Sequence, residues 1–214
     1  GQALYVSDMS LPGMLHAAVL RSPHARARIV RIDVSRAKAM SGVRAVLTGA
    51  ELDYRVGLYV VDKFILAKGE VRHYGEAVAA VAADTYAEAR RAADAIEVEY
   101  EALPPVLHHM DALRPDAPLV HPDLGSYEYV AAVFTPKPGT NIANHTRLRK
   151  GDTEKGFAES QWIVEREYSC PSVQHVPMET HVAIAQWARG DRVEIWTSAQ
   201  SPFTVRNLFC RAFR

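Results

Sequence analysis

Two imidazoles and a carboxylate lie within seven positions of the sequence, at His175, Glu179 and His181. These residue types bind zinc, and a helical zinc motif places two histidines at i and i+4 with a glutamate between them. Here the spacing is i, i+4 and i+6, and Pro177 interrupts any helix or central strand through the segment. We therefore assign no metal ligand, and expect buried polar groups that pair with one another or with the backbone.

The other histidines and the cysteines give weaker indications of a functional site. His108 and His109 are adjacent in a proline-flanked segment, where solvated side chains are expected. His24 lies among arginines, and a turn with a solvated basic face is favoured there over a small anion site. Cys170 and Cys210 are 40 positions apart without a C-x-x-C partner, so neither a redox nor a ligand role is expected. Gly-rich nucleotide motifs and the G-x-S-x-G motif are absent from the sequence.

The amino-acid composition limits the kinds of partner that this chain is expected to bind. Lys+Arg and Asp+Glu balance at 25 each, and no basic block occurs, so binding to nucleic acid is not expected. No apolar run approaches the roughly 20 residues that cross a bilayer, so membrane insertion is not expected either. Two cysteines and no signal-peptide pattern favour a reducing compartment, and we expect the cytoplasm.

The first half of the chain alternates strand and helix patterns. The helix predicted at 35–42 has Ser35 as N-cap and Gly42 as the stop at C′. The AVAAVAA stretch is apolar enough for a strand buried on both faces. Strands are predicted at 13–22, 27–34, 43–49, 76–84 and 97–103.

The strongest local signal is a helix start at Thr85. Glu88 follows three residues later, as in the capping box, and an Ala-rich stretch continues to about Ile96. The next segment alternates like an exposed edge strand, which Pro104 and Pro105 close. Strand, helix and strand form a βαβ-like unit, with the two strands either adjacent or split apart by another element.

Prolines and glycines mark residues 104–140 as a linker. After it we predict a turn at 150–157, a strand at 162–170 and a hairpin of strands 180–187 and 192–200. Residues 201–214 carry a helical stripe of apolar residues without a stop signal, which leads us to expect further protein beyond it.

Taken together, these stretches resemble a known family. LPGMLHAAVLRSPHA, YGE and EVEYEALPPV look like the α/β-hammerhead domain of molybdenum hydroxylase large subunits, the family of xanthine dehydrogenase, aldehyde oxidoreductase and aerobic carbon monoxide dehydrogenase. EIWTSAQSPFTVRN is similar to the opening of its molybdopterin-binding domain. The resemblance implies an α+β chain: a hammerhead domain at 1–105, a Pro-rich linker at 106–145, and the incomplete first portion of a mixed α/β molybdopterin-binding domain at 146–214.

The resemblance also implies a function, the oxidative hydroxylation of a small molecule with water as oxygen source. In this family the H-x-x-x-E-T segment is scaffold close to the cofactor cavity, and Gln200 in TSAQSPF matches a glutamine that approaches the molybdenum centre. An amide suits that place because it can donate to an oxo ligand and accept from a pterin N–H. The family's Gly-rich loop and general-base glutamate lie outside residues 1–214, so we assign no catalytic residue and expect no activity from this chain alone.

The implied cofactors are molybdenum–molybdopterin, shared with the rest of the subunit or a partner chain, and [2Fe–2S] clusters and FAD on partner chains or domains. The sequence has no cluster-ligating cysteine pattern of its own. The implied partners are the remaining molybdopterin-binding segment, an Fe–S subunit and an FAD subunit. Two alternatives stay open: a non-catalytic docking module of a larger complex, and a small metalloprotein built on His175, Glu179 and His181.

Overall fold

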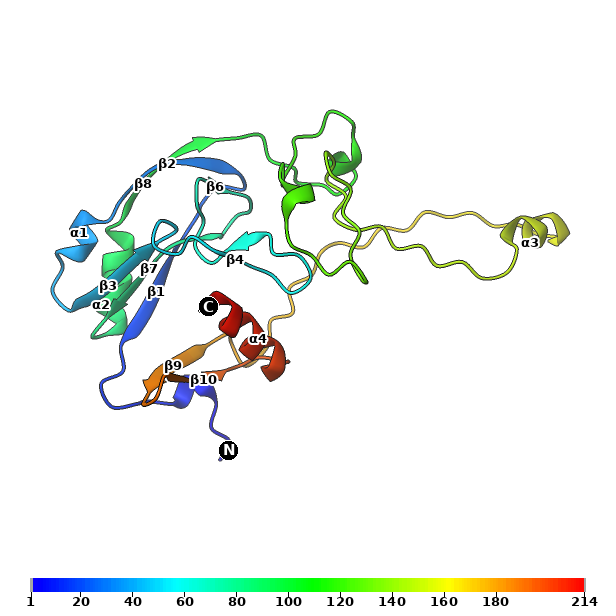
Figure 1. Cartoon of the computed structure of the whole chain (residues 1–214). Helices are drawn as coiled ribbons and strands as arrows, with labels where there is room; N and C mark the ends of the chain where they lie inside the picture. The colour runs from blue at the N-terminus through cyan, green and yellow to red at the C-terminus, as the bar shows by residue number, and fades with distance from the viewer. Residues whose placement is uncertain (1, 214) are drawn as a thin grey trace. The chain divides into compact units, whose positions relative to one another are not determined.

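The computed structural model describes residues 2–213, which form two compact units (Figure 1). The larger unit comprises residues 10–145 and 200–213 of the described chain. The smaller unit comprises residues 2–9 together with residues 146–199. Among residues 2–213 no helix is both long and apolar enough to cross a membrane.

The larger unit is built on an antiparallel three-stranded sheet in the order β1-β7-β3. Its strands are β1 (His16–Arg21), β3 (Val43–Thr48) and β7 (Ala77–Ala83). Central β7 is mostly buried, with Val78 at 0% and Val81 at 1% exposure and three alanines partly buried. All three strands were predicted, and the burial of β7 confirms the interpretation of its apolar run.

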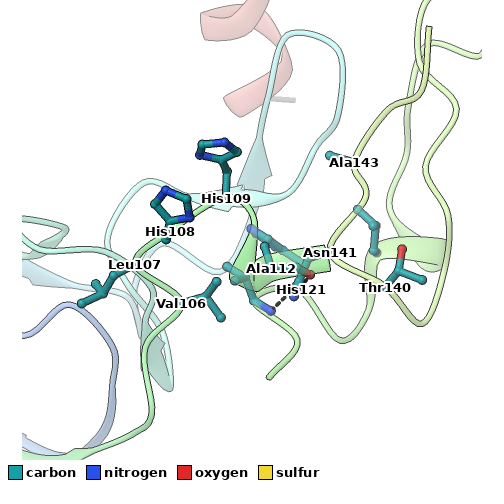
Figure 2. Close-up of a pocket in the computed structure, with 11 residues that line it drawn as sticks. Val106, Leu107, His108, His109, Ala112, His121, Thr140, Asn141 and Ala143 are labelled. Atoms are coloured by element: carbon teal, nitrogen blue, oxygen red, sulfur yellow. Dashed lines mark hydrogen bonds between the residues drawn. The ribbon is translucent and has the colours of Figure 1, made fainter. Parts of the chain in front are cut away.

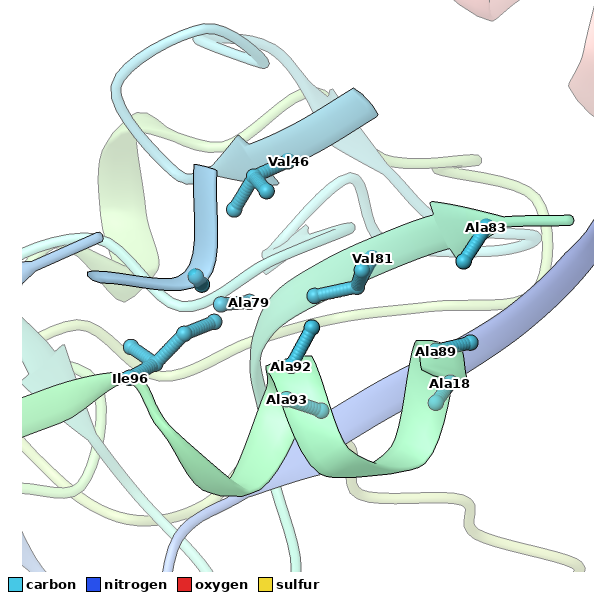
Figure 3. Close-up of a cluster of buried hydrophobic side chains, with 10 residues drawn as sticks. Ala18, Val46, Ala79, Val81, Ala83, Ala89, Ala92, Ala93 and Ile96 are labelled. Carbon is cyan, nitrogen blue, oxygen red and sulfur yellow. The ribbon is translucent and has the colours of Figure 1, made fainter. Parts of the chain in front are cut away.

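Helix α2 (Tyr86–Asp94) packs against this sheet through small side chains. In Figure 3 the side chains of Ala92 and Val81 point toward one another across the interface. Alanine lets the helix approach the sheet closely, and Ala89, Ala92 and Ala93 are all fully buried. Thr85 is the N-cap, as predicted: its Oγ1 accepts from the Glu88 N–H at 3.2 Å and donates to Glu88 Oε2 at 2.8 Å.

A second three-stranded sheet has the order β6-β2-β8. It contains β2 (Ala27–Asp33), β6 (Glu70–Val71) and β8 (Glu97–Ala102), with β8 at the edge as predicted. The two strands that flank α2 therefore lie in different sheets, so the βαβ-like unit has its strands split apart.

The short helix α1 (Ser35–Lys38) corrects the predicted caps. The N-cap position is Val34, and Ser35 is the first helical residue. The cause is Asp33, whose Oδ1 accepts from both the Ser35 N–H at 3.0 Å and the Ser35 hydroxyl at 2.6 Å. Gly42 takes a left-handed φ of +81° in the turn beyond C-cap Ala39, so it is not at C′.

The Pro-rich region is anchored in the larger unit. Two short 3-10 helices, η2 (Asp111–Leu113) and η3 (Leu124–Ser126), interrupt it. Leu124, Tyr127 and Val60 form a small core of their own. Backbone bonds from Val61 N to Glu128 O and from Val130 N to Tyr59 O, at 2.8 and 2.9 Å, tie the region to the loop between β4 (Arg55–Val56) and β5 (Lys63–Phe64).

The smaller unit contains η1 (Val6–Asp8), α3 (Thr153–Glu159) and a hairpin of β9 (Ala183–Ala188) and β10 (Arg192–Thr197). The hairpin confirms the prediction. The turn predicted at 150–157 is wrong, because Asp152 accepts from the Lys155 N–H at 2.9 Å and caps a helix. The strand predicted at 162–170 is also wrong, since that segment pairs with no strand among the described residues.

The apolar stripe near the C-terminal end of the chain forms helix α4 (Pro202–Ala212), as predicted. This helix belongs to the larger unit, where Arg211 approaches Glu128 at 4.0 Å. Phe209 and Phe213 stack along one face with ring centroids 4.4 Å apart.

Candidate functional site

His175, Glu179 and His181 lie outside helices and strands. Both histidines are exposed and Glu179 is half-buried, so the expectation of buried, mutually paired groups is wrong for the imidazoles. The backbone turns sharply between them, with Val176 at a φ of +47° just before Pro177. Within the part of the chain that the structure describes, no three His, Cys, Asp or Glu side chains come close enough to hold a metal ion.

Gln200 lies immediately before α4. Its side chain is exposed, and among residues 2–213 it has no hydrogen-bond partner. Ser201 is the N-cap, but its hydroxyl bonds with Thr204 Oγ1 at 2.7 Å and does not cap a backbone N–H. The first turn of α4 therefore presents uncapped N–H groups beside a free carboxamide, a set of donors that suits an anionic or oxo-bearing group.

The residues that lead to Gln200 are held by hydrogen bonds to segment 180–182. Ser198 Oγ donates to the Thr180 carbonyl at 3.1 Å and accepts from the Val182 N–H at 3.1 Å. The Thr197 hydroxyl donates to the Val182 carbonyl at 3.1 Å. The H-x-x-x-E-T segment thus contacts TSAQ through the main chain of Thr180, while His175 and Glu179 take no part.

Two of the stretches that carry the family resemblance, LPGMLHAAVLRSPHA and YGE, meet in the larger unit. The Ser22 N–H donates to the Glu76 carbonyl at 2.8 Å, and the Gly75 N–H donates to the Ser22 carbonyl at 2.9 Å. Gly75 has a φ of +78°, a conformation that favours glycine. Glu76 is buried, and its Oε2 accepts from the Arg72 N–H at 2.6 Å. These motif residues hold two loops together.

The basic turn around His24 carries paired charges. Arg26 bonds with Glu70 at 2.8 Å and Arg28 with Glu101 at 2.6 Å. His24 is half-buried against the Tyr100 ring, with centroids 4.9 Å apart, and burial raises the pKa of Tyr100. Carboxylates thus neutralise Arg26 and Arg28, while the Arg21 guanidinium donates to the Gly75 carbonyl at 2.9 Å.

A cavity of about 300 Å³ opens in the Pro-rich region (Figure 2). His108 and His109 lie on its wall with their rings tilted and their centroids 4.4 Å apart, and both are exposed, as predicted. Asn141, also on the wall, accepts from the Val120 N–H and donates to the Ala112 and Pro118 carbonyls. Its amide is engaged in holding the loop, so the cavity offers a ligand few free polar groups.

His121, also on that wall, forms a cluster that the sequence did not reveal. Its Nδ1 lies 3.3 Å from the Tyr127 hydroxyl, and its Nε2 lies 3.8 Å from the Asp62 carboxylate. Burial, and then the positive charge of Arg72, lower the pKa of His121 and outweigh the opposing effect of Asp62. Asp62 is far from His121 in the sequence, so no local signal could have joined them.

Comparison with known families gives two matches. The model described as "Aldehyde oxidase and xanthine dehydrogenase, a/b hammerhead domain" matches residues 1–104. The model described as "Molybdopterin cofactor-binding domain" matches residues 134–214, the region that contains Gln200 and α4.

Individual relatives agree with these matches. A probable xanthine dehydrogenase component of Bacillus subtilis is 35% identical, over 86% of this chain and 23% of its own length. The nicotinate dehydrogenase large molybdopterin subunit of Eubacterium barkeri is 34% identical, over 94% of this chain and 44% of its own length. Reconstituted CO dehydrogenase from Oligotropha carboxidovorans superposes with a TM-score of 0.84 at 31% identity, over 98% of this chain and 27% of that one. The chain thus spans less than half the length of these relatives.

Proposed function

The chain belongs to the aldehyde oxidase and xanthine dehydrogenase family, and from that membership we propose that it is a component of a molybdopterin-dependent hydroxylase or dehydrogenase. The match of residues 134–214 to a molybdopterin cofactor-binding domain carries this proposal. The proposed reaction is oxidative hydroxylation of a small molecule with water as oxygen source, in the cytoplasm. We further propose a division into a hammerhead domain at 1–105, a linker at 106–145 and a first portion of the cofactor-binding domain at 146–214.

Gln200 is the residue we propose to face the cofactor. Three observations support this: the side chain is exposed, it has no partner among residues 2–213, and it stands beside the uncapped first turn of α4. When bound, the molybdenum cofactor supplies the redox chemistry. The Gln200 carboxamide would donate to an oxygen of the bound group or accept from a pterin N–H, and would so help to orient the cofactor. Ser198 and Thr197 hold the chain just before it.

No residue of this chain is proposed as a general base, and the other redox groups are proposed to lie elsewhere. The chain's two cysteines, Cys170 and Cys210, are both free and exposed, which is too few for an iron–sulfur cluster. We therefore place [2Fe–2S] clusters and FAD on partner chains or domains. The substrate pocket and the base are assigned to the rest of the molybdopterin-binding region.

Elemental analysis of the complex purified from its native source tests this function first. Molybdenum together with iron, in a particle that contains more than this chain, is the expected result. Zinc alone at one per chain would contradict it and point to His175, Glu179 and His181, in which case His181→Ala should remove the zinc. The absence of all three metals would contradict the proposal in favour of a docking module.

Gln200→Ala in the assembled enzyme tests the site. We expect turnover to fall roughly 10–100-fold, as for other groups that orient a metal centre, with the thermal unfolding of the chain unchanged. Gln186→Ala is the matched control, because it removes an exposed carboxamide from β9. Equal turnover in both variants would remove Gln200 from the cofactor site.

A further inference from the structure

The Pro-rich region is fastened to the loop between β4 and β5. Two backbone hydrogen bonds, at 2.8 and 2.9 Å, join residues 59–61 to residues 128–130. Beside them Val60, Leu124 and Tyr127 form a cluster in which each residue is at most 9% exposed. Because this cluster is so small, a single polar contact at its edge can decide whether the loop and the region stay together.

Tyr127 connects this cluster to His121. The Tyr127 hydroxyl lies 3.3 Å from His121 Nδ1, and the two rings meet edge to face with their centroids 5.7 Å apart. The Arg55 guanidinium lies over the Tyr127 ring at 4.8 Å and over the Phe64 ring at 4.2 Å. Among residues 2–213 His121 is the one hydrogen-bond partner of the Tyr127 hydroxyl. Tyr127 is therefore held by its ring from β4 and β5 and by its hydroxyl from His121.

The neutral form of His121 suits this contact. With its proton on Nε2, the ring accepts from the Tyr127 hydroxyl at Nδ1 and directs its N–H toward the Asp62 carboxylate, 3.8 Å away. A protonated imidazole has an N–H on both nitrogens and cannot accept a hydrogen bond. The Tyr127 hydroxyl must then accept from Nδ1–H, which leaves its own proton without an acceptor in a buried side chain. Protonation of His121 therefore weakens the closed arrangement.

The charges around His121 act in the same direction. Arg72, from the loop between β6 and β7, and Arg55, on β4, oppose a positive charge on the ring, whereas Asp62 and Glu76 favour it. The Arg72 Nε is buried and has no hydrogen-bond partner among residues 2–213, and the Glu76 carboxylate bonds with the Arg72 main chain instead, at 2.6 Å. Burial and the charge of Arg72 outweigh the carboxylates and lower the pKa of His121.

We propose that His121 is a pH-sensitive latch, and that protonation of its ring loosens the Pro-rich region from the β4–β5 loop and opens the cavity that His121 lines (Figure 2). His108 and His109 lie on the same wall, where a positive charge on either ring adds to the effect. The latch is closed above the ordinary histidine pKa of about 6.5 and weakens as the pH falls through that value. It requires no cofactor, so it stands or falls independently of the proposed function.

Amide hydrogen exchange of the full chain at pH 7.5 and pH 5.5 tests the latch, with rates corrected for the intrinsic effect of pH on exchange. The reporters are the Val61 and Val130 amides, which donate across the contact. We expect their protection to fall at least roughly threefold at the lower pH. It should stay below that of the β7 amides at both pH values, because the latch opens more readily than the sheet. Equal protection at the two pH values, or protection as high as in β7, would overturn the proposal.

A matched pair of variants assigns the effect to His121. His121→Gln keeps a side chain that can accept from the Tyr127 hydroxyl but does not gain a proton, and His175→Gln changes an exposed imidazole. The fall in protection should disappear in His121→Gln and persist in His175→Gln. A general loss of packing lowers protection at both pH values alike, so the ratio between them is decisive. A ratio in His121→Gln equal to that of the unsubstituted chain would contradict the latch.

Two further variants separate the hydrogen bond from the charges. Tyr127→Phe keeps the ring beneath Arg55 and removes the hydroxyl, so the fall in protection should be smaller than in the unsubstituted chain. Asp62→Asn removes a negative charge that favours the protonated ring, so the fall should be larger. An unchanged fall in both variants would contradict the assignment of the latch to this hydrogen bond and this carboxylate.

Discussion

Two segments of this chain have sequences typical of strands, and only one of them is a strand. Residues 77–83 form the centre of a sheet, and their side chains are buried or partly buried. Residues 162–170 begin with three apolar side chains, continue with three charged ones, and stay unpaired and exposed. The difference lies in the partners. β7 is flanked by β1 and β3 and covered by α2, whereas no strand of the described chain pairs with 162–170.

Strand propensity is realised only where a neighbouring strand is available for pairing. A lone strand leaves its backbone groups hydrogen-bonded to water and its apolar face exposed, so it gains nothing over an irregular segment. The same reasoning extends to the two units: among residues 2–213, the larger unit has buried cores and the smaller unit has no buried residue.

Val81→Asp and Val164→Asp are expected to show the largest contrast. Val81 is 1% exposed, so the substitution buries an unpaired carboxylate and should cost more than about 4 kcal/mol of unfolding free energy. Val164 is 79% exposed, and the same change in the isolated chain should stay within about 0.5 kcal/mol. Urea unfolding followed by circular dichroism measures both. Comparable losses would mean that the segment around Val164 packs within the isolated chain.

The contrast also explains which parts of the fold the sequence could predict. Strand β7, the Thr85 cap and edge strand β8 follow from local patterns, and their partners lie within the chain. The error at 162–170 arose because the same pattern has no partner here. At α3 the error was local: Asp152 was assigned to a turn, although an aspartate at that position also caps a helix.

The candidate site was less predictable than the fold. Gln200 came from the family resemblance, since by itself an exposed amide between a strand and a helix signals nothing. The bonds of Ser198 to Thr180 and Val182 require the hairpin to form first. The cluster of His121, Asp62 and Tyr127 depends on long-range loop packing that leaves no mark on local sequence.

The N-caps of α2 and α3 provide a second comparison, with smaller expected losses of stability. Thr85→Ala removes the acceptor of the Glu88 N–H at the start of α2, which packs on the main core, and should cost about 1 kcal/mol of global unfolding free energy. Asp152→Ala removes the acceptor of the Lys155 N–H in α3, which has no buried residue. Its loss should fray α3 alone.

Hydrogen exchange distinguishes these outcomes. Faster exchange confined to residues 153–159 in Asp152→Ala, with unchanged global stability, is the expected pattern. A global loss in Asp152→Ala equal to that in Thr85→Ala would show that α3 contributes to a shared core.

The Pro-rich region is packed less extensively than the main sheets of the larger unit and more extensively than the smaller unit. The pH dependence of stability tests its packing most directly. It has only a small core, and His121 is half-buried at its edge. Burial and Arg72 lower the pKa of His121, so the unfolded chain binds a proton more readily than the folded chain. Stability is therefore complete above the unfolded-state pKa of about 6.5, and it falls as the pH drops through that value.

Replacing His121 should reduce this dependence of stability on pH. The change in unfolding free energy should be smaller than the loss caused by removing the Thr85 cap. We expect the difference in unfolding free energy between pH 7.5 and pH 5.5 to shrink in His121→Gln, and to persist in His175→Gln, which changes an exposed imidazole. Urea unfolding at the two pH values measures it. If the difference between the two pH values persists in His121→Gln, the pH dependence comes from other groups. The Pro-rich region then unfolds locally, without affecting the main core. If it disappears, this region unfolds together with the sheets of the larger unit, and the absence of a core is confined to the smaller unit.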